Sequence, residues 1–194
     1  MKLGIFGGTF DPPHKGHINA VVSAKESLSL DRVVVVPAYI SPFKVKRKIT
    51  EPSHRLEMTK LAFDTLFTDI SAYEVSKGGV SYTIDTLTYF RKIYPDSAYT
   101  LILGTDAFLG FDKWYKYREI IEVASLAVVS RNSDDSEKIS ERADSIKNLC
   151  EVFTVKVNPI SVSSTQIREN PSEYKDYLTE NVYEYIEKNG LYKK

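Results

Sequence analysis

Short apolar runs alternate with helical patterns along this chain. Runs such as Val33-Val34-Val35-Val36 are apolar on both faces, which is typical of strands buried in a parallel sheet. The alternation of strand and helix predicts an α/β protein with a doubly wound parallel sheet. Strands are expected at Leu3–Phe6, Arg32–Val36, Ile70–Tyr73, Tyr99–Leu103, Leu126–Val129 and Glu151–Val155. Helices are expected at Gly16–Leu28, Ser53–Leu66, Thr83–Ile93, Tyr117–Val123, Glu137–Asn148 and Glu173–Lys188, with Gly190 placed to cap the last one.

Two segments between these elements are expected to be mobile or solvent-facing loops, Ile40–Pro52 and Arg131–Glu137. The first carries Lys44, Lys46, Arg47 and Lys48. A charged loop is usually just solvated, but this one follows the second strand and would lie beside a crevice at the carboxyl edge of the sheet. The chain shows no internal repeat, and its 194 residues fit one domain, residues 1–194.

Composition narrows the class of partner. Lys and Arg number 26 and Asp and Glu also number 26, so the formal net charge is zero. Nucleic-acid and membrane surfaces call for a basic excess, so a small ligand is the more natural partner. No apolar run approaches the ~18 residues that span a bilayer, and no signal peptide pattern opens the chain. Cys150 is the single cysteine, which excludes an internal disulfide, favours a cytoplasmic location, and indicates a core residue rather than a nucleophile.

The segment from Gly7 to His17, GGTFDPPHKGH, lies at the turn from the first strand to the first helix. Open α/β sheets place their ligands at such turns. Gly7 and Gly8 let the backbone approach a bulky anion, while the two prolines stiffen the loop. His14 and His17, two of the three histidines in the chain, add imidazoles. The pattern matches neither the dinucleotide nor the P-loop motif, yet it indicates a site for nucleotide phosphates.

Two simpler interpretations of this segment stand beside the phosphate site. The glycines and prolines could merely punctuate a turn. The histidine pair could bind zinc, although four ligands are usual and no cysteine or third histidine lies near.

A second candidate anion site is Ser163-Ser164-Thr165-Gln166-Ile167-Arg168. Its Ser and Thr residues are good helix N-caps, and free backbone N–H groups at a helix start attract anions. Arg168 adds a planar, permanently charged fork that suits phosphate oxygens. Local sequence alone explains this segment equally well as a helix cap followed by a solvent-facing arginine.

Two further segments allow a binding role and a structural one. Gly104-Thr105-Asp106 follows an expected strand, and Asp106 could accept hydrogen bonds from ribose hydroxyls or, like Thr105, cap a helix. Trp114 and Tyr115 stand between lysines and could stack on a flat ring or anchor the core.

The H-x-G-H element within GGTFDPPHKGH, followed far downstream by SSTQIR, resembles the HxGH nucleotidyltransferases and, more narrowly, bacterial nicotinate mononucleotide adenylyltransferases. The matching segments run in the family order from Gly7 to Arg168. The resemblance implies a Rossmann-like nucleotidyltransferase fold. It also places Gly104–Asp106 against adenosine, and Trp114–Tyr115 with the Ser81-Tyr82-Thr83 segment around a pyridine ring. The chain departs from the family at Phe43, where histidine is usual, which puts the role of that histidine in doubt.

The implied reaction joins ATP and nicotinate mononucleotide to give nicotinate adenine dinucleotide and pyrophosphate. The 5′-phosphate of the mononucleotide attacks the α-phosphorus of ATP, so catalysis rests on positioning and charge stabilisation. Magnesium would bridge the phosphates, held by ATP and water rather than by a protein metal site; homo-oligomer formation stays open. The expected catalytic residues are His14, His17 and Arg168. The expected ATP-binding residues are Gly7, Gly8, Thr9, Phe10, Gly104, Asp106, Ser164 and Thr165. The expected mononucleotide-binding residues are Lys44, Tyr82, Thr83, Trp114 and Tyr115. His54-Arg55 matches a segment that we interpret as structural.

Three rival functions remain from the sequence. The acceptor could be nicotinamide mononucleotide, which differs from the nicotinate form at one small group. It could be phosphopantetheine or another phosphate, against which the Trp114 and Tyr82 segments argue. The chain could also be a non-catalytic nucleotide sensor, but binding alone does not require His14, His17 and Arg168 together. Pyrophosphate release separates the enzyme from the sensor.

Overall fold

The computed structural model describes residues 1–46, 48–64, 67–130, 135–158 and 160–193. In these residues six parallel strands form one sheet in the order β3-β2-β1-β4-β5-β6. The order reverses between β1 and β4, as in doubly wound nucleotide-binding folds. The strands are β1 (Lys2–Gly8), β2 (Arg32–Pro37), β3 (Thr68–Ile70), β4 (Ala98–Gly104), β5 (Ala124–Ser130) and β6 (Val152–Lys156).

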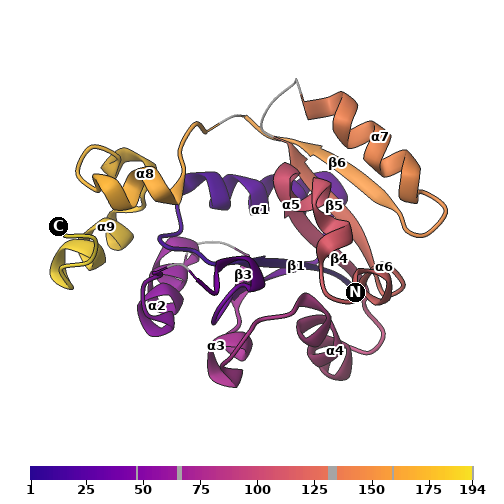
Figure 1. Cartoon of the computed structure of the whole chain (residues 1–194), viewed down its shortest axis with the longest axis horizontal. Helices are drawn as coiled ribbons and strands as arrows, with labels where there is room; N and C mark the ends of the chain where they lie inside the picture. The colour runs from indigo at the N-terminus through magenta and orange to yellow at the C-terminus, as the bar shows by residue number, and fades with distance from the viewer. Residues whose placement is uncertain (47, 65–66, 131–134, 159, 194) are drawn as a thin grey trace.

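Helices cover both faces of the sheet, which confirms the predicted fold class (Figure 1). Residues from α1 (Lys15–Leu28), α2 (Pro52–Phe63), α8 (Ser164–Glu169) and α9 (Glu180–Lys188) share one apolar core with Val33 and Val35 of β2. Val34 and Val36 face the opposite core. That second core includes residues from α4 (Thr83–Ile93), α5 (Thr105–Leu109), α6 (Tyr117–Ile121) and α7 (Ser136–Ile146). The Val33–Val36 run is therefore apolar at every position because each face of β2 is buried.

Two element predictions are wrong. The strand expected at Ile70–Tyr73 ends at Ile70, and Tyr73 instead begins the short helix α3 (Tyr73–Lys77). The turn is made by Ser71, whose hydroxyl accepts a hydrogen bond from the Tyr73 N–H at 3.2 Å. The helix expected at Glu173–Lys188 is split into a 3₁₀ turn, η4 (Lys175–Tyr177), and α9. Thr179 separates them because its side chain accepts from the N–H of Val182 and starts a new helix there.

The two predicted loops are shorter than expected. Segment 40–52 contains a 3₁₀ turn, η1 (Pro42–Lys44), and Pro52 already begins α2, in the first-turn position that suits proline. Arg47 and Leu66 lie outside the described residues, as do residues 131–134 of the second loop, whose end at Ser136–Glu137 belongs to α7. Gly190 follows α9 with φ of 60°, a conformation that glycine adopts easily, which confirms its predicted capping position. No helix in the described part of the chain is long and apolar enough to span a bilayer.

Candidate functional site

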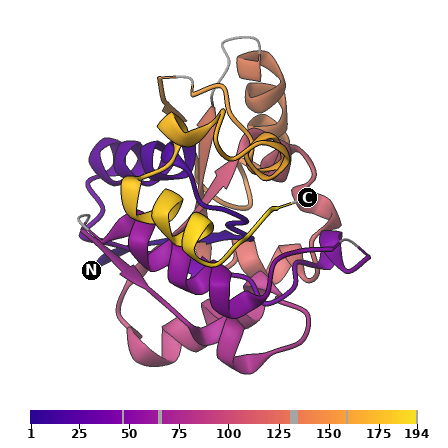
Figure 2. The same cartoon turned by 90° about the vertical axis from the view of Figure 1, so that its left-hand side faces the viewer.

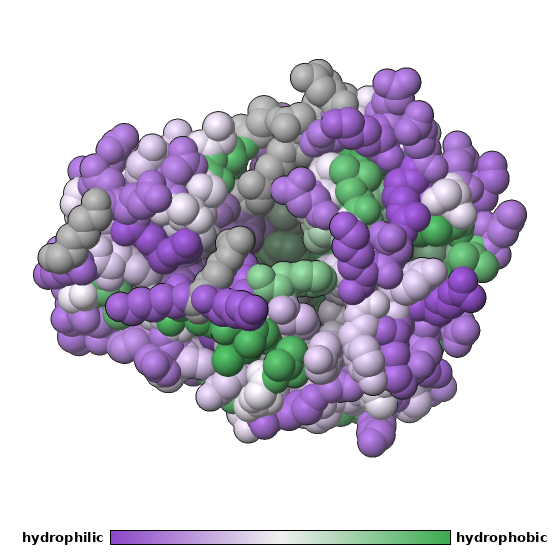
Figure 3. All heavy atoms as spheres, in the orientation of Figure 1, coloured by the Kyte–Doolittle hydropathy of each residue, from purple (hydrophilic) through white to green (hydrophobic). Residues whose placement is uncertain are grey.

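Two cavities open where β1 and β4 end, at the point where the strand order reverses. One, of about 550 Å³, has aromatic and apolar walls, and we call it the aromatic cavity; the other, of about 420 Å³, is lined mainly by polar and basic side chains, and we call it the basic cavity. Figure 3 shows this face of the molecule, mostly hydrophilic, hollowed near its middle with apolar side chains around the hollow. Thr9 and Lys44 line both cavities, and the Lys44 ammonium donates to the Thr9 hydroxyl at 3.0 Å. The two cavities therefore meet at this pair.

His14 and His17 stand in the wall of the basic cavity, at the start of α1. His14 is the N-cap of this helix, and its Nδ1 accepts a hydrogen bond from the N–H of Gly16 at 3.2 Å. The Nδ1 of His17 accepts from the N–H of His14, also at 3.2 Å. Because both Nδ1 atoms accept, each neutral imidazole carries its proton on Nε2. The helix cap thus fixes both rings as Nε2–H donors, with ring centroids 3.8 Å apart.

The opposite wall of the basic cavity comes from the start of α8. Ser163 caps this helix, and its side chain accepts from the N–H of Gln166. The Ser164 hydroxyl donates to the carbonyl of Pro12 at 2.9 Å. Arg168 donates to the carbonyl of Asp11 at 2.7 Å and to the hydroxyl of Thr165 at 3.1 Å. The two predicted anion sites, far apart in sequence, therefore form one cavity and are tied together by direct hydrogen bonds.

Arg55 holds the loops behind both cavities in place. Its side chain is fully buried, and its guanidinium donates to the carbonyls of Thr9 and Ala38 at 2.8 and 2.6 Å. It also donates to the carbonyls of Tyr39 and Thr50 at 2.7 and 2.8 Å. Burial lowers the pKa of this guanidinium, and the nearby carboxylate of Asp11 opposes that shift. Arg55 connects the loop after β1 to the loop after β2, which supports its predicted structural role.

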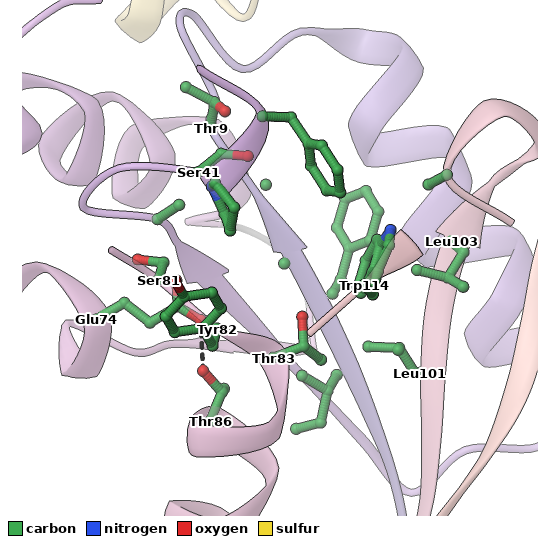
Figure 4. Close-up of a pocket in the computed structure, with 18 of the residues that line it drawn as sticks. Thr9, Ser41, Glu74, Ser81, Tyr82, Thr83, Thr86, Leu101, Leu103 and Trp114 are labelled. Carbon is green, nitrogen blue, oxygen red and sulfur yellow. Dashed lines mark hydrogen bonds between the residues drawn. The ribbon is translucent and has the colours of Figure 1, made fainter. Parts of the chain in front are cut away.

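Aromatic side chains form much of the aromatic cavity (Figure 4). Tyr82 packs on Tyr115 with ring centroids 4.6 Å apart, and the ring of Phe43 lies 6.4 Å from that of Trp114. In Figure 4, Tyr82 lies on one side of the cavity and Trp114 on the other. Phe43 is 57% exposed, so it adds an apolar surface at the cavity rim rather than a hydrogen-bonding group.

A buried carboxyl group, Glu74 of α3, also lines the aromatic cavity. The hydroxyl of Thr86 in α4 donates to it (Figure 4), and Ser81 is a second hydrogen-bonding partner. Burial raises the pKa of Glu74, and these two hydrogen bonds oppose the shift. The Ser81 hydroxyl also accepts from the N–H of Tyr39 at 2.9 Å. Glu74 and Ser81 therefore connect the Tyr82–Thr83 wall to the loop after β2.

The structure places every predicted site residue at one of the two cavities. The predicted catalytic residues share the basic cavity. Phe10 contributes backbone there, because its ring is buried in the core and only 1% exposed. Gly7, Gly8 and Gly104, which we expected at ATP, line the aromatic cavity beside the residues expected at the mononucleotide. The alternative helix-capping role of Thr105 and Asp106 is wrong, since Gly104 is the N-cap of α5.

Several residues that build the site were not identified from sequence. Glu74, Thr86 and Lys113 line the aromatic cavity, and Lys48 and Ile49 line the basic one. Glu74 was missed because it directly follows the expected strand Ile70–Tyr73 and belongs to no motif. Lys48 was predicted only as one charge of the loop Ile40–Pro52, and the others belong to no motif that signals a site. His54 lies in neither cavity, and its Nδ1 forms a 2.9 Å hydrogen bond with the hydroxyl of Tyr185.

Comparison with known proteins gives consistent results. The model of the cytidylyltransferase-like family matches residues 5–170. A "Probable nicotinate-nucleotide adenylyltransferase" from Thermoanaerobacter sp. (strain X514) is 38% identical, with 100% of this chain and 95% of that protein covered. A protein of the same name from Thermotoga sp. (strain RQ2) is 36% identical over 96% of this chain and 95% of its own length.

Solved structures share the fold. Plasmodium falciparum nicotinic acid mononucleotide adenylyltransferase, complexed with APC, superposes with a TM-score of 0.79 at 18% identity, covering 98% of this chain and 96% of that chain. The same enzyme complexed with NaAD gives a TM-score of 0.77 at 18% identity, with 98% and 97% covered.

Proposed function

This chain belongs to the cytidylyltransferase-like family and, within it, to the nicotinate-nucleotide adenylyltransferases, and on that premise we propose that it joins ATP to nicotinate mononucleotide, releasing pyrophosphate. The observation that carries the proposal is the meeting of an aromatic and a basic cavity at Thr9 and Lys44. Transfer between two substrates requires their phosphates to meet, and this junction provides one place for both. We further propose that residues 1–194 act as one nucleotidyltransferase domain, working in the cytoplasm.

In the proposed reaction, the basic cavity binds the triphosphate of ATP. The mononucleotide phosphate is already an anion at neutral pH, so its attack on the α-phosphorus needs no strong base. His14 and His17 would donate their Nε2 protons in hydrogen bonds to phosphate oxygens as charge develops on the leaving pyrophosphate. Arg168 and Lys44 would place positive charge on either side.

The aromatic cavity suits the pyridine ring of the mononucleotide. Tyr82 and Trp114 offer flat apolar surfaces, and ring stacking contributes about 0.5–1.5 kcal/mol beyond the area buried. Thr83 stands at the first position of α4, and Gly104 opens space at the end of β4. The mononucleotide phosphate would then reach Lys44 at the junction with the basic cavity.

Magnesium is expected to arrive with ATP. No group of three His, Cys, Asp or Glu side chains suited to a metal ion occurs among the described residues. Asp106 does supply one carboxylate to the wall of the basic cavity, which fits a Mg²⁺ ion held mostly by phosphate oxygens and water. The ion would neutralise phosphate charge during the transfer.

The test is pyrophosphate release with ATP and magnesium, comparing nicotinate mononucleotide, nicotinamide mononucleotide and phosphopantetheine. A preference for the nicotinate substrate supports the proposal. Phosphopantetheine as the best substrate would contradict the assignment of the aromatic cavity, and no release with any acceptor would favour the sensor.

The His17→Ala variant tests the assigned donor. We expect turnover to fall by roughly 10²–10³-fold, the scale for losing one transition-state donor. His54→Ala is the matched control, because its imidazole lies outside both cavities and contacts Tyr185 instead. Near-normal turnover by a folded His17→Ala protein would remove His17 from the mechanism.

The Trp114→Ala variant tests the aromatic cavity. It should raise the KM for nicotinate mononucleotide by about tenfold, as expected for losing 1–2 kcal/mol of ring contact, with little change in the KM for ATP. An equal loss for both substrates would assign Trp114 to the core, where its ring contacts Phe111 with centroids 5.3 Å apart.

A further inference from the structure

A buried carboxylate, Asp11, lies between the two walls of the basic cavity. It is 3% exposed, and its backbone carbonyl accepts the 2.7 Å hydrogen bond from Arg168. Its Oδ2 accepts from the N–H of Thr50 at 3.2 Å. Its Oδ1 accepts from the hydroxyl of Tyr192 at 2.8 Å. Asp11 therefore joins three segments of the chain at the cavity wall, one through its backbone and two through its side chain.

Tyr192 reaches Asp11 from the segment that follows α9. Figure 2 shows α9 alongside α2, with this segment continuing between α2 and α8. The hydroxyl of Tyr192 also lies 3.9 Å from the sulfur of Met58 in α2. Burial and the adjacent Asp11 carboxylate raise the pKa of the Tyr192 phenol, so it stays protonated and donates at neutral pH. Tyr192 does not line the basic cavity, so any effect on the chemistry passes through its hydrogen-bonding partners, Asp11 and the side chain of Thr50.

The backbone conformation of Tyr192 also indicates that its side-chain contacts hold it in place. Its φ is 63°, in the left-handed region, where a residue other than glycine is disfavoured by about 1–2 kcal/mol. Such a conformation persists when surrounding contacts hold it there. Its side chain forms the hydrogen bond to Asp11, approaches the sulfur of Met58 and shares a further hydrogen bond with the side chain of Thr50.

Thr50 links the hydrogen bond between Tyr192 and Asp11 to the loop that lines the basic cavity. Asp11 holds the N–H of Thr50, while Arg55 holds its carbonyl at 2.8 Å. The two residues before Thr50, Lys48 and Ile49, line the basic cavity. Buried hydrogen bonds linked in this way support one another, so loss of one donor loosens the others.

We propose that Tyr192 is a positioning residue for the transfer reaction: its hydroxyl fixes the Asp11 carboxylate and thereby the placement of Arg168 and of the loop that leads to His14. The inference rests on the proposed function. A displacement of catalytic groups that originates away from the reacting atoms lowers turnover by up to about 100-fold. The positioning effect comes from the hydroxyl alone. A phenylalanine ring at this position should therefore fill the same space and still fail to position Asp11.

The variant that isolates the hydroxyl is Tyr192→Phe. Tyr185→Phe is the matched control, because it removes a tyrosine hydroxyl bonded to His54 of α2, outside both cavities. We expect Tyr192→Phe to lower kcat by about 10- to 100-fold with the KM of nicotinate mononucleotide changed less than about twofold. Tyr185→Phe should keep the wild-type kcat, and thermal unfolding of both variants shows whether they lose similar stability.

A double-mutant cycle with Asp11→Asn completes the test. If Tyr192 acts through Asp11, the double variant should have a kcat close to that of Asp11→Asn alone, because the two effects are not additive. Unchanged kcat in Tyr192→Phe, equal kcat losses in both tyrosine variants, or fully additive losses in the cycle would overturn the inference alone. Absence of turnover in the wild-type protein with every mononucleotide would instead overturn the proposed function, and this inference with it.

Discussion

Adjacent glycines at the end of β1 should respond in opposite ways to the same added methyl group. Side chains alternate between the faces of a strand, so Gly7 and Gly8 point to opposite sides of the sheet. A Cβ at Gly8 would lie 2.6, 2.7 and 3.0 Å from three ring carbons of Phe10, well inside van der Waals contact. A Cβ at Gly7 would have no atom within 4 Å, because it would enter the aromatic cavity.

The expected loss of stability in Gly8→Ala follows from this contact. Phe10 is 1% exposed, and its ring packs against those of Phe6 and Phe63, so it has little room to retreat. Overpacking of this kind destabilises a protein by about 1–3 kcal/mol. For a protein of this size, each kcal/mol lowers Tm by about 2–4 °C, so the Tm of Gly8→Ala should fall by about 2–12 °C.

Gly7→Ala should keep or slightly raise the stability. Gly7 does not have a positive φ, so alanine fits its backbone, and the unfolded chain loses entropy worth about 0.4–1 kcal/mol. Its methyl group would occupy space that a substrate uses. We therefore expect kcat/KM to fall by about tenfold, equivalent to about 1.4 kcal/mol.

Thermal unfolding and steady-state pyrophosphate release, measured on the same preparations, check both variants. Equal Tm losses at the two positions would show that the space beside Gly7 is not open. A Tm within about 1 °C of wild type for Gly8→Ala would refute the contact with Phe10 as a source of strain. Full activity in Gly7→Ala would show that substrate does not approach the end of β1.

Two further predictions concern buried charged groups. Arg55→Met should lower the free energy of unfolding by about 2–6 kcal/mol in denaturant melts, since at least two buried carbonyls would lose a donor at about 1–3 kcal/mol each. Arg91→Met, the same change at an exposed position, should stay within about 0.5 kcal/mol of wild type, and a similar value for Arg55→Met would refute this role. Burial raises the pKa of Glu74 in the folded protein, so the folded state favours the protonated carboxyl group. The stability that Glu74 contributes is therefore present below the pKa that this group has in the unfolded chain, and it is lost as pH rises through the pKa of the folded state. Unfolding free energies measured against pH should therefore show Glu74→Gln gaining stability relative to wild type as pH rises above the unfolded pKa of 4.5, and a pH-independent difference would contradict this sign.

The strands were largely predictable from sequence because five of the six contain a short, mostly apolar run. β3 was misplaced by a few residues, since Thr68–Ile70 is short and includes the charged Asp69. The short helix α3 carries too few residues for a periodic pattern, and its position depends on the contacts of Glu74 with Thr86 and Ser81. Helical periodicity also extended the last helix too far, because the capping effect of Thr179 is a single local contact.

The candidate site was predictable where chemistry and spacing coincide in one short segment, as at His14, His17 and Arg168. The contacts that hold those groups in place were not, even for Arg55, whose structural role was predicted. Tyr192 meets Asp11 across 181 positions, and Arg55 meets Thr9 across 46. An arginine in a helix or a tyrosine near the end of the chain gives no sign of such a contact in the sequence. The partner becomes apparent only when distant segments fold together.

The arrangement of the strands explains why the two cavities meet at Thr9. After β1 the chain turns to α1 on one face of the sheet, whereas α5, which follows β4, packs on the other face. The loops after these neighbouring strands therefore diverge and leave open space above their carboxyl ends. The basic cavity forms on the side of α1, whose N-terminus favours anions, and the aromatic cavity forms on the side of α4 and α5. Any phosphate passing between them must cross the end of β1, where Lys44 donates to Thr9, so that pair marks the position at which the transfer would take place.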